Sequence, residues 1–153
     1  MKLRKKSLLI ISGSGAQGGA EKQLLNLVNN LEEFNIYLLI FNANKKFADS
    51  IKKTNIKKII FLNKKYFSST IKSFKELNEI INGVREKIFI QGWLPKGNLV
   101  AFLFFIFINK KRKSLIFSHR NSFFLYQTLS SQIVLFSSLI ISFLNLGKIY
   151  HVA

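Results

Sequence analysis

A glycine-rich segment near the N-terminus is the first place where residue types and spacing suggest chemistry. It reads Gly13-Ser14-Gly15-Ala16-Gln17-Gly18-Gly19-Ala20-Glu21 and lies between an apolar run of strand length and a segment of helical period. Glycines let the backbone approach a ligand closely, and the N-terminus of the following helix presents unpaired N–H groups and the positive end of its dipole. The segment therefore predicts a binding site for a phosphate or a sugar hydroxyl. A tight strand-to-helix turn without a ligand is the alternative that the residues leave open.

The same glycines satisfy the G-x-G-x-x-G pattern of dinucleotide-binding proteins, at Gly13, Gly15 and Gly18. That pattern also needs an acidic residue about 20 residues further on, at the end of the second strand, where it binds the ribose. Here the second predicted strand ends in Phe41-Asn42-Ala43-Asn44, which contains no acid. A Walker A loop is excluded because no Gly-Lys-Ser or Gly-Lys-Thr follows the glycines. A nucleotide- or dinucleotide-binding module stays open as an alternative function.

Two further groups of polar and aromatic residues directly follow predicted strands. Trp93 and Asn98 follow the fourth strand, and His119, Arg120 and Asn121 follow the fifth. A Trp ring can stack on a sugar face, an Asn can hydrogen-bond hydroxyls, and an Arg fork pairs with phosphate. The alternatives are a core Trp, an Asn that caps a helix and a solvated Arg.

The elements that would position these residues alternate regularly along the chain. Apolar runs predict strands at residues 7–12, 36–42, 57–62, 87–91, 114–118 and 148–152. Helical periods lie between them, at residues 20–34, 47–53, 69–82, 98–109 and 126–145, with Gly83 expected as the C-cap of the third helix. This alternation predicts an α/β, Rossmann-like fold with a parallel sheet flanked by helices. The polar segments all follow strands at their carboxyl ends, so they are expected to line one wall of a cleft.

Composition limits the class of protein. The 153 residues suit one domain, and a hydrophobic content of 48% with 16 Phe excludes a disordered chain. The chain has no Cys, which excludes disulfide scaffolds, thiolate metal sites and Cys nucleophiles. Its two His residues cannot form a metal site without the few carboxylates, so no metal is expected.

The charge favours anionic partners. Lys and Arg number 24 against 7 Asp and Glu, a net charge of +17, which attracts phosphates or anionic lipid headgroups. No basic helix or RNA-reading aromatic motif indicates nucleic acid. The apolar segments 99–108 and 133–146 fall short of the ~20 residues that a membrane span requires. Packing on the sheet, docking of a partner domain and shallow insertion into a bilayer stay open for them, and a small peripheral membrane protein is a further alternative.

The chain begins with a basic segment, Met1-Lys2-Leu3-Arg4-Lys5-Lys6, and an apolar stretch at residues 8–11. That stretch is too short for the hydrophobic region of a signal peptide. It is therefore expected to form a buried strand of a cytoplasmic protein, which could lie peripherally at the inner face of the membrane.

Three segments together resemble the N-terminal domain of the family 4 (group 1) glycosyltransferases. The first, Gly18-Gly19-Ala20-Glu21-Lys22-Gln23-Leu24-Leu25-Asn26-Leu27, is similar to the turn and helix that open that family. Gln91-Gly92-Trp93-Leu94-Pro95-Lys96-Gly97-Asn98-Leu99 and Ser118-His119-Arg120-Asn121-Ser122 follow in the matching order, so the resemblance covers essentially the whole chain. Lys96 departs from the pattern, because relatives often carry His there, and any contact made by that His is in doubt.

The resemblance implies a retaining enzyme of the GT-B fold, in which two Rossmann-like domains face each other across a cleft. It implies transfer from a nucleotide-sugar co-substrate, without another cofactor, to a lipid-linked or polysaccharide acceptor at the cytoplasmic membrane face. Gly18, Gly19 and Glu21 would lie at the cleft floor near the donor diphosphate and the acceptor hydroxyl. The other implied substrate-binding residues are Trp93 and Asn98 on the acceptor side and Arg120, with His119 and Asn121 beside it, on phosphate.

The donor site of that family is missing from the sequence. In relatives a C-terminal domain binds the nucleotide-sugar through an E-x7-E pair, whereas Glu79 and Glu86 have six residues between them and flank the start of the fourth strand. We therefore expect residues 1–153 to form one truncated, acceptor-side domain without the donor-binding domain. Such a chain is expected to be inactive alone, and no catalytic residue can be assigned.

Overall fold

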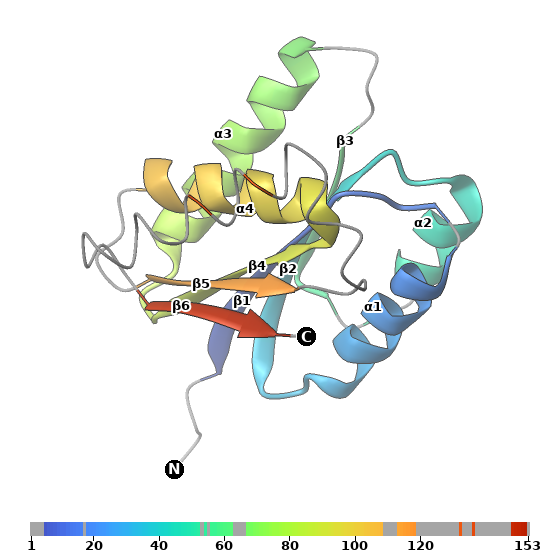
Figure 1. The fold of residues 1–153 in the computed structure, drawn as a ribbon, viewed down its shortest axis with the longest axis horizontal. Coiled ribbons are helices and arrows are strands. Elements are labelled where there is room, and N and C mark those ends of the chain that lie inside the picture. The colour runs from blue at the N-terminus through green and yellow to red at the C-terminus, as the bar shows by residue number, and fades with distance from the viewer. Residues whose placement is uncertain are drawn as a thin grey trace.

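A computed structural model describes residues 5–16, 18–52, 54, 56–62, 67–108, 113–118, 132, 136 and 148–152, with the backbone only for 67–70 and 148–152. Helices and strands alternate along the chain (Figure 1). The strands are β1 Lys6–Ser12, β2 Phe34–Phe41, β3 Lys58–Leu62, β4 Ile88–Trp93, β5 Lys113–Ser118 and β6 Lys148–Val152. The helices are α1 Gly19–Asn30, α2 Lys45–Lys52, α3 Phe67–Gly83 and α4 Leu94–Phe107.

The six strands form one sheet in the order β3-β2-β1-β4-β5-β6, and every neighbouring pair is parallel. The predicted α/β, Rossmann-like fold is therefore confirmed. From β1 the chain builds the sheet outward through β2 and β3, and then crosses back to place β4 on the other side of β1. This reversal makes the carboxyl ends of β1 and β4 the topological switch point, where open α/β sheets bind their ligands.

Alternate residues of the central strand face two separate cores. Leu8 and Ile10 of β1 pack in a cluster with residues of α1 and α2, whereas Leu9 and Ile11 pack in a second cluster with residues of α3 and α4. Successive side chains of a strand point to opposite faces, so a continuous apolar run is what a strand covered on both faces requires. The pair α1 and α2 therefore covers one face of the sheet, and α3 and α4 cover the other (Figure 1).

The predicted element boundaries differ from the observed ones at the end of α1 and around β4. The helix predicted at residues 20–34 ends at Asn30, and Phe34 already belongs to β2. The β4 strand continues to Trp93, and α4 begins at Leu94, four residues before the predicted start. Pro95 explains the early start, because the first turn of a helix tolerates the missing N–H of proline. The α3 helix ends at Gly83, the residue predicted to close it, although Gly83 does not have the positive φ that is usual for a glycine at a helix C-terminus. The predicted helix 126–145 lies almost entirely outside the described residues.

The first turn of α4 lies directly against the ends of β1 and β4, and two glycines make this possible. A Cβ added at Gly97 would collide with the carbonyl oxygen of Ile11 and come within 2.9 Å of the Gly13 nitrogen. A Cβ added at Gly92 would lie 2.7 Å from the backbone nitrogen of Asn98. Real Cβ atoms do not approach backbone this closely, so a side chain at either position would push α4 away from the sheet.

We predict that Gly97→Ala lowers the free energy of unfolding by about 1–3 kcal/mol, because the added methyl overpacks a backbone contact. Gly83→Ala is the matched control: its Cβ would meet nothing within 4 Å, and it lies at the far end of α3. That control should be neutral or stabilise by up to about 1 kcal/mol. Urea denaturation of both variants measures the difference, and equal stability of the two would contradict the close packing of α4.

Candidate functional site

Two of the three polar segments lie at the carboxyl edge of the sheet, and the strand that precedes the third ends at the same edge. Ser12, the last residue of β1, is in register with Trp93 of β4, and Trp93 is in register with Ser118 of β5. The glycine segment therefore leaves the sheet beside the start of α4, and the chain also leaves β5 at this edge. His119, Arg120 and Asn121 lie outside the described residues.

The glycine segment is held between the ends of β4 and β2. The backbone nitrogen of Gly13 donates to the carbonyl oxygen of Trp93 at 3.0 Å. Further along, Gly15 forms a parallel bridge with Ala43, and the nitrogen of Asn44 donates to the Gly15 oxygen at 3.0 Å. A Cβ at Gly15 would lie 2.5 Å from the Cα of Ala43, so only glycine allows this approach. Gly13 and Gly15 are thus bonded to β4 on one side and to the chain after β2 on the other.

Glu21 stabilises the start of α1 from inside the protein. Its side chain is buried, and its Oε2 accepts a hydrogen bond from the backbone nitrogen of Gly18 at 3.1 Å. A carboxylate in the first turn also interacts favourably with the positive end of the helix dipole. The same negative charge opposes a phosphate placed close by and instead suits a donor such as a hydroxyl. Of the two ligand groups predicted for this turn, the geometry favours the sugar hydroxyl.

Gly19 is an accessible position of the turn. It is exposed, and a Cβ added there would meet no atom within 4 Å. Its neighbour Gly18 has an extended backbone, with φ −130° and ψ −174°, and precedes the helix as its N-cap. The open side of Gly19 is therefore where a ligand could approach the backbone at the start of α1.

Trp93 does not have the predicted role of a sugar-stacking platform. Its side chain is completely buried in the core beneath α1, and its Nε1 donates to the carbonyl oxygen of Ala20 at 3.1 Å. A ring without exposed surface cannot stack on a ligand, so the alternative of a core Trp is the correct one. Trp93 instead ties the end of β4 to the first turn of α1, where it helps to fix Gly19 and Glu21.

Asn98 is likewise a positioning residue and not a ligand contact. It is the fifth residue of α4, so the helix-capping alternative is wrong as well, and it is only 3% exposed. Its Nδ2 donates to the carbonyl oxygen of Ser118 at 3.1 Å, and its Oδ1 accepts from the Ser118 nitrogen at 3.3 Å. The nitrogen and the oxygen of the Asn98 side chain therefore both bind the backbone of Ser118, at the end of β5. Asn98 fixes the point from which the chain continues to residue 119.

Sequence reasoning missed two members of this buried polar group. Gln91 donates from its Nε2 to the hydroxyl of Ser118 at 2.8 Å, and both side chains are buried. The signal was present in the sequence, because Gln91 is a polar residue in an otherwise apolar strand run and must find a partner when buried. Together Gln91, Asn98 and Ser118 connect β4, α4 and β5 at the edge where the site is expected.

Lys96 supplies a positive charge at the same edge. It is exposed in the first turn of α4, and its Nζ lies 4.2 Å from the centroid of the Phe41 ring at the end of β2. The connection into this turn is strained, because Leu94 has a φ of 68°, which a bulky side chain rarely adopts. Such strained residues persist where the surrounding structure holds them, often at functional sites.

The opposite edge of the sheet has a different character. Glu79 and Glu86 line a cavity of about 480 Å³ there together with Ser7, as expected from their place before β4. Lys113, at the start of β5, donates from its Nζ to the carbonyl oxygen of Ile108 at 2.7 Å, and burial lowers its pKa. Within the described ranges, no three His, Cys, Asp or Glu side chains are grouped to hold a metal ion.

We predict that Asn98→Leu lowers the free energy of unfolding by about 1–3 kcal/mol, because it leaves the buried Ser118 backbone groups without partners. Asn30→Leu is the control, since the Asn30 amide makes one exposed hydrogen bond to the Asn26 carbonyl on the surface of α1. The control should change stability by less than about 0.5 kcal/mol. Chemical denaturation compares the two, and a loss of similar size in both would remove the special role of Asn98.

Comparison with known proteins does not assign this chain to a family. No protein-family model matches the chain, and no curated protein matches its sequence. The functional assignment therefore rests on the residues at the carboxyl edge of the sheet.

Proposed function

We propose that this chain is the acceptor-side domain of a glycosyltransferase of the GT-B type. In this proposal the complete enzyme transfers a sugar from a nucleotide-sugar donor to a lipid-linked or polysaccharide acceptor at a membrane surface. The chain contributes one wall of the cleft, and a facing domain contributes the donor-binding wall. The three segments that resemble family 4 supply the assignment of the reaction.

The observation that carries the proposal is the position of the turn formed by Gly18, Gly19 and Glu21. It lies at the topological switch point, next to the end of β1 and tied to β4 through Trp93. The negative charge of Glu21 beneath the turn disfavours a phosphate relative to a hydroxyl, and accessible Gly19 leaves space for a ligand to reach the backbone. An acceptor hydroxyl placed here would face the cleft from the side on which a donor sugar arrives.

Two observations disfavour the alternative of a dinucleotide-binding module. The end of β2 offers Asn42 and Asn44 where a ribose-binding acid is required, and Oδ1 of Asn44 is already engaged by the nitrogen of Phe47 at 2.8 Å. The bridge between Gly15 and Ala43 also closes the space between the first two strand ends. The ribose of a bound dinucleotide would lie in this region.

In the proposed reaction the chain's own residues bind and orient the acceptor. The rigid turn holds the acceptor hydroxyl in one position, and such positioning removes part of the entropic barrier to transfer. The positive charge of Lys96 lies at the same edge and would attract a phosphate group of the acceptor. Stabilisation of the developing charge on the leaving diphosphate falls to the facing domain.

We predict that Gly19→Val reduces kcat/KM about 100-fold or more once the chain is joined to its donor-binding domain, because a side chain displaces the acceptor by an ångström or more. The fold should survive, since a Cβ at this position meets nothing within 4 Å. Gly83→Val makes the same change at an equally open glycine at the end of α3, beside the opposite edge of the sheet, and should keep full activity. Unchanged turnover by Gly19→Val would remove the turn from the site.

We also expect residues 1–153 alone to show no transferase activity, because one cleft wall cannot stabilise the transition state. The test incubates the purified chain with a panel of radiolabelled nucleotide-sugars and a membrane lipid extract, with and without an added donor-binding domain. Label should enter lipid or polymer only when both domains are present. Turnover of a sugar nucleotide by the isolated chain would refute this division of roles.

A further inference from the structure

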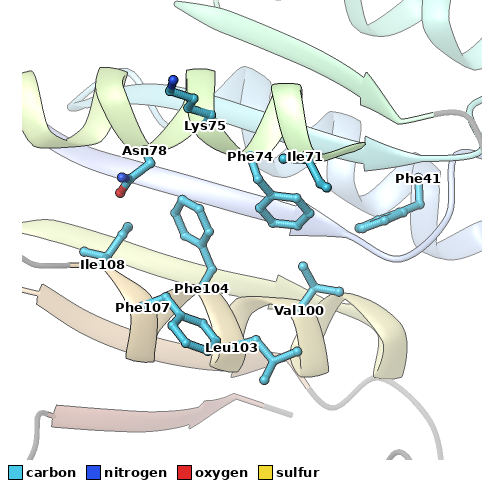
Figure 2. A pocket seen from close by; sticks show the side chains of 10 residues that line it. All are labelled: Phe41, Ile71, Phe74, Lys75, Asn78, Val100, Leu103, Phe104, Phe107 and Ile108. Atoms are coloured by element: carbon cyan, nitrogen blue, oxygen red, sulfur yellow. The ribbon is translucent and has the colours of Figure 1, made fainter. Parts of the chain in front are cut away.

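An apolar groove lies between α3 and α4, the two helices that cover one face of the sheet. Its volume is about 690 Å³, within the ~300–1,000 Å³ typical of small-molecule sites. Eight of its ten lining side chains are apolar, and Lys75 and Asn78 are the polar ones. Figure 2 shows Phe74 and Ile71 on α3 facing Phe104 and Val100 on α4 across this space.

The groove is lined by large side chains that folding has left in contact with solvent. Phe107 is 80% exposed, Ile71 55% and Leu103 44%. The α4 helix therefore carries more apolar surface than the sheet covers. Soluble proteins rarely keep a contiguous apolar surface of this kind without using it for binding.

The groove leads to the candidate site. At one end it is lined by Phe41, the last residue of β2, and at the other by Ile108, just beyond α4 (Figure 2). The Phe41 ring also carries the ammonium group of Lys96 at 4.2 Å from its centroid. The groove therefore combines a long apolar floor with a positive charge at the end that adjoins the carboxyl edge of the sheet.

An apolar groove with a positive charge at one end is complementary to an amphiphile, which has a hydrocarbon chain and, here, an anionic headgroup. We propose that the groove binds the hydrocarbon chain of an anionic lipid, with the lipid's phosphate headgroup next to Lys96. A second copy of the chain is a poorer occupant, because two proteins that each carry a net charge of +17 repel each other. A neutral apolar ligand would gain no electrostatic attraction from the positive charge at that end of the groove. This proposal of lipid binding does not depend on enzyme activity. The additional step, that the bound lipid is the sugar acceptor, rests on the proposed function.

The test is titration of residues 1–153 with dodecyl phosphate below its micellar concentration, at low salt, by isothermal calorimetry. The wild-type chain should bind saturably with one ligand per protein. Leu103→Trp should weaken binding about tenfold or more, because the larger ring fills the groove. Ile106→Trp is the matched control, since Ile106 lies on the same helix, is 47% exposed against 44% for Leu103, and does not line the groove. It should bind as the wild type does.

A second variant tests the headgroup. Lys96→Gln should weaken dodecyl phosphate binding about two- to fivefold at low salt, as expected for an exposed ion pair, and the difference should shrink at high salt. Binding of the uncharged dodecyl maltoside should be unaffected by this substitution. A Lys96→Gln chain that binds both ligands like the wild type would overturn the placement of the headgroup.

The remaining outcomes also decide the question. No saturable binding by the wild type, or an equal loss in Leu103→Trp and Ile106→Trp, would overturn the groove as a lipid site. Wild-type dimers that Leu103→Trp dissociates, seen by sedimentation, would show that a second copy occupies the groove. Because the titration contains no nucleotide-sugar, its failure would leave the transferase proposal standing, and a failed transfer assay would not affect this result.

Discussion

The structure of the candidate site depends on one close contact, the approach of the first turn of α4 to the ends of β1 and β4. Gly92 and Gly97 remove the side chains that would otherwise keep the helix at normal distance from the sheet. The result brings Lys96 to the carboxyl edge and places the Asn98 amide within hydrogen-bonding distance of β5. The contact thus joins α4 to an edge at which the glycine segment is already bonded to the ends of β4 and β2.

The residues that hold this edge together are buried and polar. In a low-dielectric interior an unpaired amide is costly, while a fully satisfied one fixes a single geometry. The side-chain amide of Asn98 makes two hydrogen bonds to the backbone of Ser118, and Gln91 donates to the hydroxyl of the same residue. Trp93 has a similar function at α1 through its bond to Ala20. The polar and aromatic residues of the second motif thus serve mainly as scaffold for the surface that a ligand would meet.

The sequence was sufficient to predict the parallel sheet, because strands buried on both faces require apolar runs such as that of β1. It also placed the motifs at one edge, since carboxyl ends of parallel strands coincide. It could not show which way Trp93 points: a strand-end aromatic suits either a ligand or the core, and only the packing of α1 decides. The start of α4 was misplaced for a related reason, because Gly92 and Pro95 resemble loop residues until their tertiary contacts are known.

The α4 helix connects the groove to the candidate site. Its first turn serves the carboxyl edge, while Val100, Leu103 and Phe107 follow at intervals of three and four residues and form one stripe along the groove. At about 1.5 Å per residue, this stripe extends roughly 10 Å from its first member to its last. Lys96 lies one turn before Val100 and reaches Phe41, which closes the groove at the strand end. A lipid in the groove would therefore contact the same helix whose first turn orients the carboxyl edge of the sheet. Binding of its hydrocarbon chain would place its headgroup at that edge.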